Sequence, residues 1–280
     1  MKNKSFIKII AIAIILPLLS GSLTAQKKIE LKYKLKAGDK YSYITKLDQD
    51  INFESNGQEV SLNQLMNFYI TMNIEKGENT GDYKIVSTID RIAMEQKIFG
   101  MELKYDSDDS STFSSGMGKQ IGDEMNKLIG KSYSVEVDRY GNIKAIDMGE
   151  ISENKDISEN INNNSSFAVY PAHKIAIGES WETDIKPLNN TDMKIHTKYT
   201  ITKIKGKKAY INFESTLTSP DNSDLKISGT QKGNLTVNKK TGWITHSEID
   251  QELKINISQG GIEVPAEVSG TMETNSNKIK

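Results

Sequence analysis

Bulky apolar residues alternate with polar ones along most of this chain, and this period of two constrains the fold more than any other feature. In segment 41–55, YSYITKLDQDINFES, the side chains of Leu47, Ile51 and Phe53 share one parity. Such alternation places one face of a strand on a core and the other in water, as in antiparallel sheets. The sequence therefore predicts a mainly β protein with on the order of a dozen strands. The pattern recurs in segments 82–94, 208–218, 225–237 and 242–257.

Glycines stand between the predicted strands, as is typical of tight reversals. Asn56-Gly57 is a strong signal for a short hairpin. Because glycine reaches positive φ without steric cost, these positions predict strands that are joined largely by hairpins. Comparable glycines lie within segments 77–83, 137–144, 203–210 and 237–244.

One segment, about residues 110–130, has helical spacing instead. Ser114 or Ser115 is placed to cap the start of this helix, and Gly130 is placed to end it. Internal glycines weaken a helix by roughly 1 kcal/mol each, so packing has to stabilise this one. The apolar residues that share one helical face are Phe113, Met117, Ile121, Met125 and Leu128.

Two similar motifs, GDKY at 38–41 and GESW at 178–181, each follow an extended apolar segment. A long hairpin and a closing hairpin come after each motif, so we interpret the chain as two related antiparallel β units, either curved sheets or half-barrels. The acid of each motif is interpreted as a turn residue and the aromatic as an anchor for the next strand. The predicted boundaries are 26–150 for the first unit with its inserted helix, 151–168 for a polar linker, and 169–280 for the second unit.

The first 25 residues have the three parts of a secretory signal peptide. Lysines are followed by the apolar run 9–19, which is much shorter than the roughly 20 residues that cross a bilayer as a helix. We therefore expect export to the periplasm or the exterior, with no membrane-spanning segment after cleavage at Ala25. The chain has no cysteine, which excludes disulfides, thiolate catalysis and a lipoprotein anchor.

Few residues are suited to catalysis or to metal binding. The three histidines, His173, His196 and His246, are far apart in sequence and form no metal-binding motif. DSDDSS at 106–111 lacks the glycine and glutamate of a calcium loop, and GESW is not a nucleophile elbow. The net charge of −1 and the mixed charges argue against nucleic acid as a partner. We expect neither an enzyme, a cofactor nor a metal, although a catalytic triad assembled from distant residues stays open.

Three short stretches resemble a known group of proteins. They are LIGKSYSVEVDRYGNI at 128–143, YPAHKIAIGESW at 170–181 and GNLTVNKKTGWI at 233–244. These stretches are similar to the bacterial exported proteins of domain-of-unknown-function family 6263 (DUF6263). The resemblance implies an exported, β-rich protein, and it implies no activity and no site residue.

Three functional hypotheses remain. The first is a non-catalytic binding or carrier module for a lipid, another apolar ligand or an envelope protein, in which Phe113, Met117, Ile121 and Met125 form a lid over a curved sheet. A Met and Phe stripe is more often plain core. The second is a structural or assembly protein of the envelope. The third is a hydrolase whose catalytic residues cannot be identified from the sequence. A transmembrane β-barrel is disfavoured because both parities of many strands carry charges.

Overall fold

The computed structural model describes residues 28–55, 57–113, 116–153, 167–185, 193–220, 225–259 and 262–280. The predicted signal peptide, 1–25, lies outside the described residues, and so does most of the predicted linker, 151–168. The boundaries of the two units therefore stay predictions.

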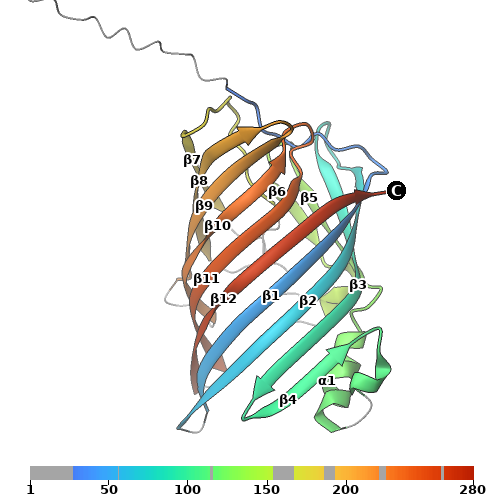
Figure 1. Ribbon diagram of the computed structural model, residues 1–280, viewed down its shortest axis with the longest axis vertical. Helices are drawn as coiled ribbons and strands as arrows, with labels where there is room; N and C mark the ends of the chain where they lie inside the picture. The colour runs from blue at the N-terminus through green and yellow to red at the C-terminus, as the bar shows by residue number, and fades with distance from the viewer. Residues whose placement is uncertain are drawn as a thin grey trace, which may run out of the picture.

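Among the described residues, twelve strands form one antiparallel sheet (Figure 1). Their order is β6-β5-β3-β2-β1-β12-β11-β10-β9-β8-β7, and β4 pairs with β3 off this path. The strands are β1 (Lys40–Ser55), β2 (Gln58–Lys76), β3 (Tyr83–Ile98), β4 (Met101–Asp106), β5 (Ser132–Val137), β6 (Ile143–Asp147), β7 (Ser180–Ile185), β8 (Lys194–Lys205), β9 (Lys208–Thr218), β10 (Leu225–Asn238), β11 (Ile244–Gln259) and β12 (Ile262–Ile279).

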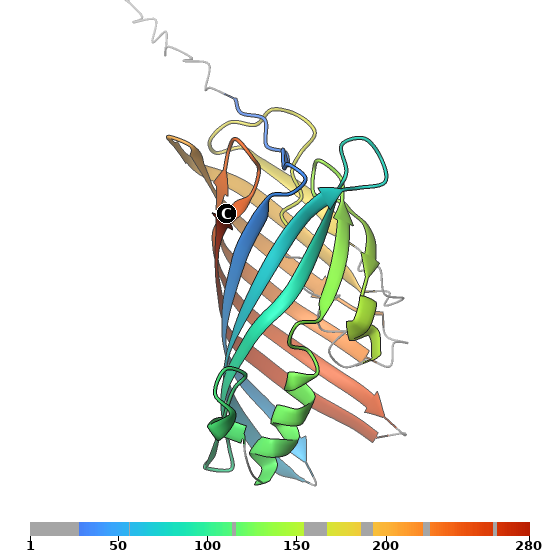
Figure 2. The same cartoon turned by 90° about the vertical axis from the view of Figure 1, so that its right-hand side faces the viewer.

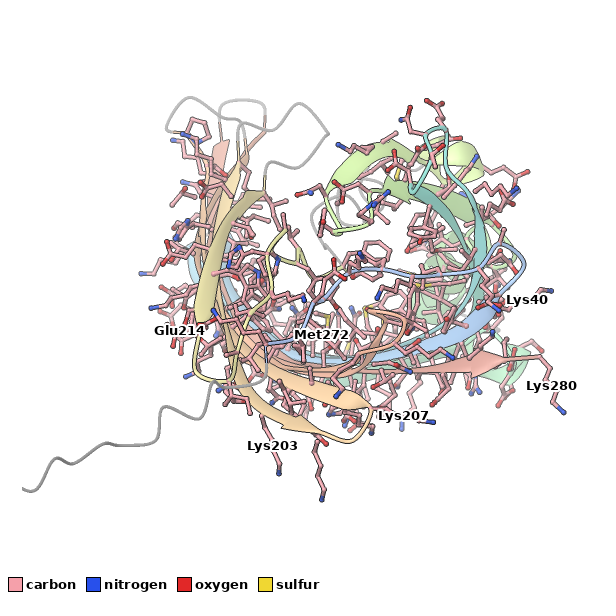
Figure 3. All side chains as sticks on the ribbon, turned by 90° about the horizontal axis from the view of Figure 1, so that it is seen from above. Lys40, Lys203, Lys207, Glu214, Met272 and Lys280 are labelled. Atoms are coloured by element: carbon pink, nitrogen blue, oxygen red, sulfur yellow. The ribbon has the colours of Figure 1, made fainter. Side chains whose placement is uncertain are left out.

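The sheet is continuous from the first part of the chain into the last, because β12 lies between β1 and β11. Strands β6 and β7 end this path and do not pair with each other in the described residues, so the sheet curves strongly but does not close (Figure 3). The predicted fold class, a mainly β protein built from a curved antiparallel sheet with one inserted helix, is confirmed.

The two Gly-acid motifs make the same backbone hydrogen bonds. Gly38 N–H donates to the Ile74 carbonyl, and Ile74 N–H donates to the Asp39 carbonyl at 2.9 Å. At the second motif, Gly178 N–H donates to the Ile201 carbonyl, and Ile201 N–H donates to the Glu179 carbonyl. Each motif thus turns the chain into the first strand of a hairpin at the same register. The interpretation of the chain as two related units stays a prediction.

The extended segments before these motifs lie together across one end of the sheet (Figure 2). They pair through a bridge between Ile29 and Ile175. We call these two segments, residues 28–37 and 167–177, the strap. Tyr33 N–H donates to the Arg139 carbonyl in the β5–β6 turn, and Lys34 N–H donates to the Thr241 carbonyl in the β10–β11 turn, so the strap also binds both of these turns. Aromatic and aliphatic side chains of the strap are buried there and belong to the largest core cluster. Their burial stabilises the fold.

The observed helix is shorter than the helix predicted over about residues 110–130. The structure has η1 (Ser110–Phe113), α1 (Gly116–Asn126) and, later, η2 (Gly149–Glu153). Residues Ser114 and Ser115 lie outside the described range. The expectation that Gly130 ends the helix is wrong: α1 stops at Asn126, because Gly130 N–H donates to the Ile89 carbonyl of β3 and the chain is already pairing with the sheet.

Candidate functional site

The two faces of the curved sheet differ sharply in charge. Figure 3 shows Met272 inside the curve, whereas Glu214 and Lys203 point away from it. Because side chains alternate along a strand, the register then assigns every paired residue to the concave or the convex face. The convex face of β8 to β11 carries His196, Lys198, Glu214, Lys232, Glu248, Asp250, Glu252 and Lys254.

A row of uncharged polar residues crosses the concave face at a single register, and we call it the polar belt. Each successive member is the direct cross-strand partner of the one before it. Eight members have hydroxyl or amide side chains, and Gly270 is the ninth. In sheet order from β7 to β3 the belt is Thr183, Thr197, Ser215, Gln231, Gln251, Gly270, Gln49, Gln64 and Gln96.

Hydrogen bonds between neighbours use only part of the capacity of the belt. The hydroxyls of Thr197 and Ser215 are 2.8 Å apart, and Gln231 Nε2 donates to Gln251 Oε1 at 3.2 Å. The hydroxyl of Thr183 is buried without a partner among the described residues. Thr197, Ser215 and Gln251 are buried, whereas the other four glutamines of the belt are only half-buried. Since a glutamine amide has two donor hydrogens and an accepting oxygen, donors and acceptors of these four remain available on the concave face.

Apolar rows lie on both sides of the belt. The row toward the strap contains Trp181, Tyr199, Phe213, Gly233, Ile249, Met272, Leu47, Met66, Met94 and Tyr105. The row on the other side contains Ile185, Ile195, Leu217, Gly229, Leu253, Val268, Ile51, Leu62, Ile98 and Met101. Neither row contains a charged residue, so the expectation that both parities of many strands carry charges is wrong for these rows. Burial raises the pKa of Tyr199 to about 12.

The second of these rows is incompletely covered. Ile195, Leu217 and Val268 are buried, but Ile51, Leu62 and Leu253 are only half-buried. An apolar surface that stays partly exposed on the inside of a curved sheet is what a site for an apolar molecule requires.

Glycines allow the close approach of strands on this face. A Cβ at Gly233 would collide with the Glu248 carbonyl of β11, and one at Gly270 would collide with the Asp48 carbonyl of β1. Glycines at such points let a sheet bend tightly, which produces the curvature that shapes the concave face.

The residues predicted to form a ligand-contacting helix face lie at one end of the concave face, on the side of β4 (Figure 2). Phe113, Ile121 and Met125 pack against a buried cluster that includes Ile92 and Tyr105. The Phe113 ring also lies against Gly122 in α1. The side chain of Met117 lies outside the described part of the structure. These contacts are those of core residues, and the role of this face in ligand binding stays a prediction.

The histidines do not gather into a site. His196 Nδ1 and Asp184 Oδ1 are 2.7 Å apart, but the pair stands on the convex face and the His196 side chain is 51% exposed. His246, also on the convex face, contacts Asn275 at 3.0 Å, and His173 is exposed. Within the described ranges, no group of three or more His, Cys, Asp or Glu side chains is placed to hold a metal ion.

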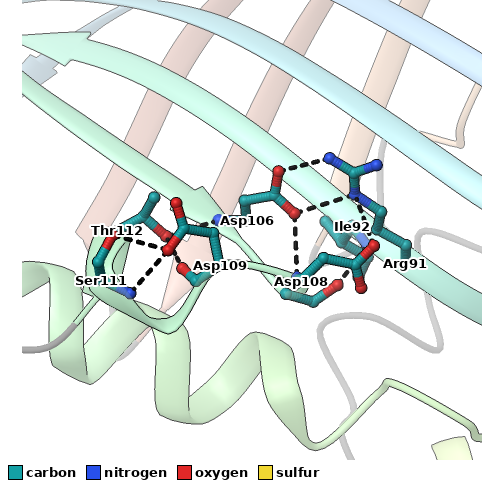
Figure 4. Close-up of polar contacts among 8 residues, drawn as sticks. Arg91, Ile92, Asp106, Asp108, Asp109, Ser111 and Thr112 are labelled. Carbon is teal, nitrogen blue, oxygen red and sulfur yellow. Dashed lines mark hydrogen bonds and ion pairs between the residues drawn. The ribbon is translucent and has the colours of Figure 1, made fainter.

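The acidic loop before η1 is held by its own hydrogen bonds (Figure 4). Arg91 donates to both oxygens of Asp106, from Nε at 2.9 Å and from Nη2 at 2.5 Å. Asp108 N–H donates to Asp106, and Ser111 N–H donates to Asp109, each at 3.0 Å. The hydrogen bond from the Arg91 guanidinium holds the pKa of the Asp106 carboxyl below its usual value. This loop is therefore a structural brace between β3 and β4.

We expect Asp106→Asn to lower the Tm at neutral pH and to have less effect in acid. The folded-state pKa of Asp106 is depressed, so its ionised form contributes stability above the ordinary aspartate value of about 4, and that contribution is lost as the pH falls through the lower folded value. Thermal unfolding between neutral pH and pH of about 3 measures this. Asp108→Asn is the control, because its carboxylate is more exposed and lies farther from Arg91, at 3.4 Å. An equal Tm loss at both extremes contradicts the ionic origin.

A surface pocket of about 390 Å³ lies near the β2–β3 and β5–β6 turns. Its walls carry both signs of charge, including Glu78, Asp82, Arg139 and Lys144. Glu78 N–H donates to Glu136 Oε1 at 2.9 Å, so its walls are tied to one another. Because its charges are of both signs, the pocket points to no single class of ligand.

Comparison with solved structures finds a similar fold. A structure of lipovitellin, described by its lipid–protein interactions, aligns with a TM-score of 0.53 and 11% identity over 87% of this chain and 25% of that chain. This chain thus spans about a quarter of that lipovitellin chain, and the likeness is one of fold alone. No curated protein matches the sequence.

Two outer-membrane structures align more weakly. The translocator domain of the autotransporter NalP from Neisseria meningitidis gives a TM-score of 0.26 and 8% identity over 86% of this chain and 89% of that one. The COG4313 outer membrane channel from Pseudomonas putida F1 gives 0.23 and 7% over 88% and 97%. Likenesses this weak do not establish a shared fold.

In the part of the chain that the structure describes, none of the helices combines the length and the apolar character needed to cross a membrane.

The sequence model of a family of unknown function, DUF6263, matches residues 152–244. This range contains two of the three stretches on which the resemblance was based, 170–181 and 233–244. Over residues 152–244 the predicted relationship to the DUF6263 family is thereby confirmed.

Proposed function

We propose that this protein is an exported, non-catalytic binding or carrier protein that holds an apolar ligand on the concave face of its sheet. The observation that carries the proposal is the half-buried apolar row of Ile51, Leu62 and Leu253, on a face whose rows contain no charge. Burial of such surface by a ligand contributes roughly 25 cal/mol per Å² before the costs of association.

Further support comes from the fold and from the N-terminal pattern. The lipovitellin structure that shares the fold is described by its interactions with lipid. Residues 1–25 have the pattern of a signal peptide, which favours an exported location. The paired His196 and Asp184 lie on the convex face with side chains that are 51% and 80% exposed, so this pair is not in an enclosed site.

A matched pair of variants on β11 tests the proposal. Leu253 is on the concave face and its neighbour Glu252 is on the convex face, so a lysine at either position changes the same strand. Leu253→Lys should weaken binding of the fluorescent apolar probe N-phenyl-1-naphthylamine about tenfold or more, because the probe would then lie against a desolvated ammonium group. Glu252→Lys should leave the affinity unchanged.

Fluorescence titration measures the affinities, and circular dichroism checks that both variants are folded. Native mass spectrometry of the protein from its own host should also find a bound apolar molecule. A wild-type protein that binds no probe and carries no such molecule overturns the proposal.

The structural or assembly hypothesis also has an observation in its favour. Among the described residues, strands β6 and β7 each pair on one side only, and Phe99 and Met101, at the β3–β4 hairpin, are 67% and 54% exposed. Free strand edges and exposed apolar tips are sites where another chain can dock. A stable complex that depends on Phe99 and forms without any bound lipid would favour this alternative.

A further inference from the structure

We propose that the polar belt selects apolar ligands that carry an uncharged carbonyl linkage, an ester or an amide, between two hydrocarbon portions. This inference rests on the proposed function and names the chemistry of the ligand that the concave face recognises.

The position of the belt between two apolar rows sets where the polar group of a ligand lies. Successive concave residues on one strand are about 7 Å apart, so hydrocarbon extends from the belt in both directions along the face. A molecule with its polar group at one end could not occupy both apolar rows and place that group on the belt. A linkage inside the molecule can.

The hydrogen-bonding groups of the belt suit a carbonyl oxygen. Glutamine amides and threonine hydroxyls donate, and a carbonyl accepts. The Gln49 side chain makes no hydrogen bond to the other described residues, and the hydroxyl of Thr183 is buried without one there. A polar group in apolar surroundings is costly until it is paired, so a ligand that pairs it gains over one that cannot.

The described residues of the belt and its flanking rows carry no charge. This absence decides whether the belt favours a neutral linkage or an ionic group in the ligand. A carboxylate or phosphate at the belt would find no lysine or arginine there to compensate its desolvation. The belt therefore disfavours a fatty-acid anion at this depth and favours a neutral ester or amide.

The belt could instead serve only to hold strands together, since Gln96 Nε2 donates to Gln64 Oε1 at 2.7 Å. The two roles predict different ligand preferences. A purely structural belt changes the stability of the sheet and leaves the ratio of ester to hydrocarbon affinity unchanged.

The test compares a long-chain wax ester with an alkane of the same chain length, each measured by displacement of the fluorescent apolar probe. Wild-type protein should bind the ester about tenfold more tightly than the alkane, as expected for one or two well-made hydrogen bonds. The double variant Gln231→Leu, Gln251→Leu removes two paired amides together, so neither is left alone. It should bring the ratio to about one, while the alkane binds at least as well as before.

The control is Thr230→Leu with Glu252→Leu, a cross-strand pair on the convex face of the same two strands, which should keep the wild-type ratio. Gln49→Leu provides a second variant if the double variant does not fold, because its amide makes no hydrogen bond to the described residues, and it should lower the ratio severalfold. If the wild type binds the ester and the alkane equally, or if the belt variants keep the wild-type ratio of ester to alkane affinity, this inference is overturned and the proposed binding of apolar ligands stands.

If the wild type binds neither ligand, the proposed function is overturned, and this inference with it.

Discussion

Gly141→Ala is expected to lower the free energy of unfolding by about 2–4 kcal/mol, through backbone strain and overpacking together. Gly141 has a φ of 91°, in a region that residues with a Cβ rarely adopt. A Cβ there would also collide with the Ala168 carbonyl and approach the buried Tyr33 ring to 2.9 Å. The substitution thus pushes the β5–β6 turn away from the strap that crosses the end of the sheet.

Gly178→Ala is the matched control. Its φ is 82°, similar to that of Gly141, but beyond its chain neighbours no atom lies within 4 Å of the position that a Cβ would occupy. Only the conformational strain remains, so the loss should be about 1 kcal/mol. Urea unfolding of the two variants measures both values. Equal losses would show that the collision with Ala168 contributes nothing.

Trp243→Ala is expected to cost about 3–5 kcal/mol, the range for removing a large buried aromatic side chain. Trp243 is 4% exposed and stacks on Tyr41, with ring centroids 4.2 Å apart. Its Nε1 donates to Ser276 Oγ at 2.8 Å. The side chain therefore joins β12 and β1 to the turn before β11, where the first and last parts of the chain meet.

Trp243→Phe separates packing from the hydrogen bond. A phenyl ring keeps most of the contact with Tyr41 and loses the donor to Ser276, so we expect a smaller cost of about 1–2 kcal/mol. Chemical denaturation followed by circular dichroism measures both variants. A cost for Phe as large as that for Ala would mean that the hydrogen bond, and not the stacking, stabilises this junction.

The strands could be predicted from the sequence because the alternation that marks a strand lies within a short segment of the chain. Alternation in 41–55 gave β1, and Asn56-Gly57 gave the hairpin in which Ser55 pairs with Gln58. The pairing of β1 with β12 was beyond such reasoning. A period of two assigns a side chain to a face of its strand but does not name the neighbouring strand.

The polar belt was missed for the same reason. Each member is one Gln, Ser or Thr at an inward position of its strand, as Gln49 is in β1, and looks like an ordinary interruption of an apolar pattern. Only the registers of all the strands together place Gln49 beside Gly270 and Gln64. The helix was found by its spacing, but its end was misplaced, because competition from β3 for the backbone at Gly130 is a tertiary effect.

The neighbouring positions of β1 and β12 have a consequence for how the protein acquires its structure. Thr45 and Thr274, whose hydroxyls are 3.0 Å apart, are 229 positions apart in the chain. Contacts of such high contact order slow folding, because the entropy of closing a long loop is lost before the contact forms. While β12 is still being synthesised, β1 has one unpaired edge. We therefore expect a slow folder that needs protection from aggregation until synthesis has passed β12.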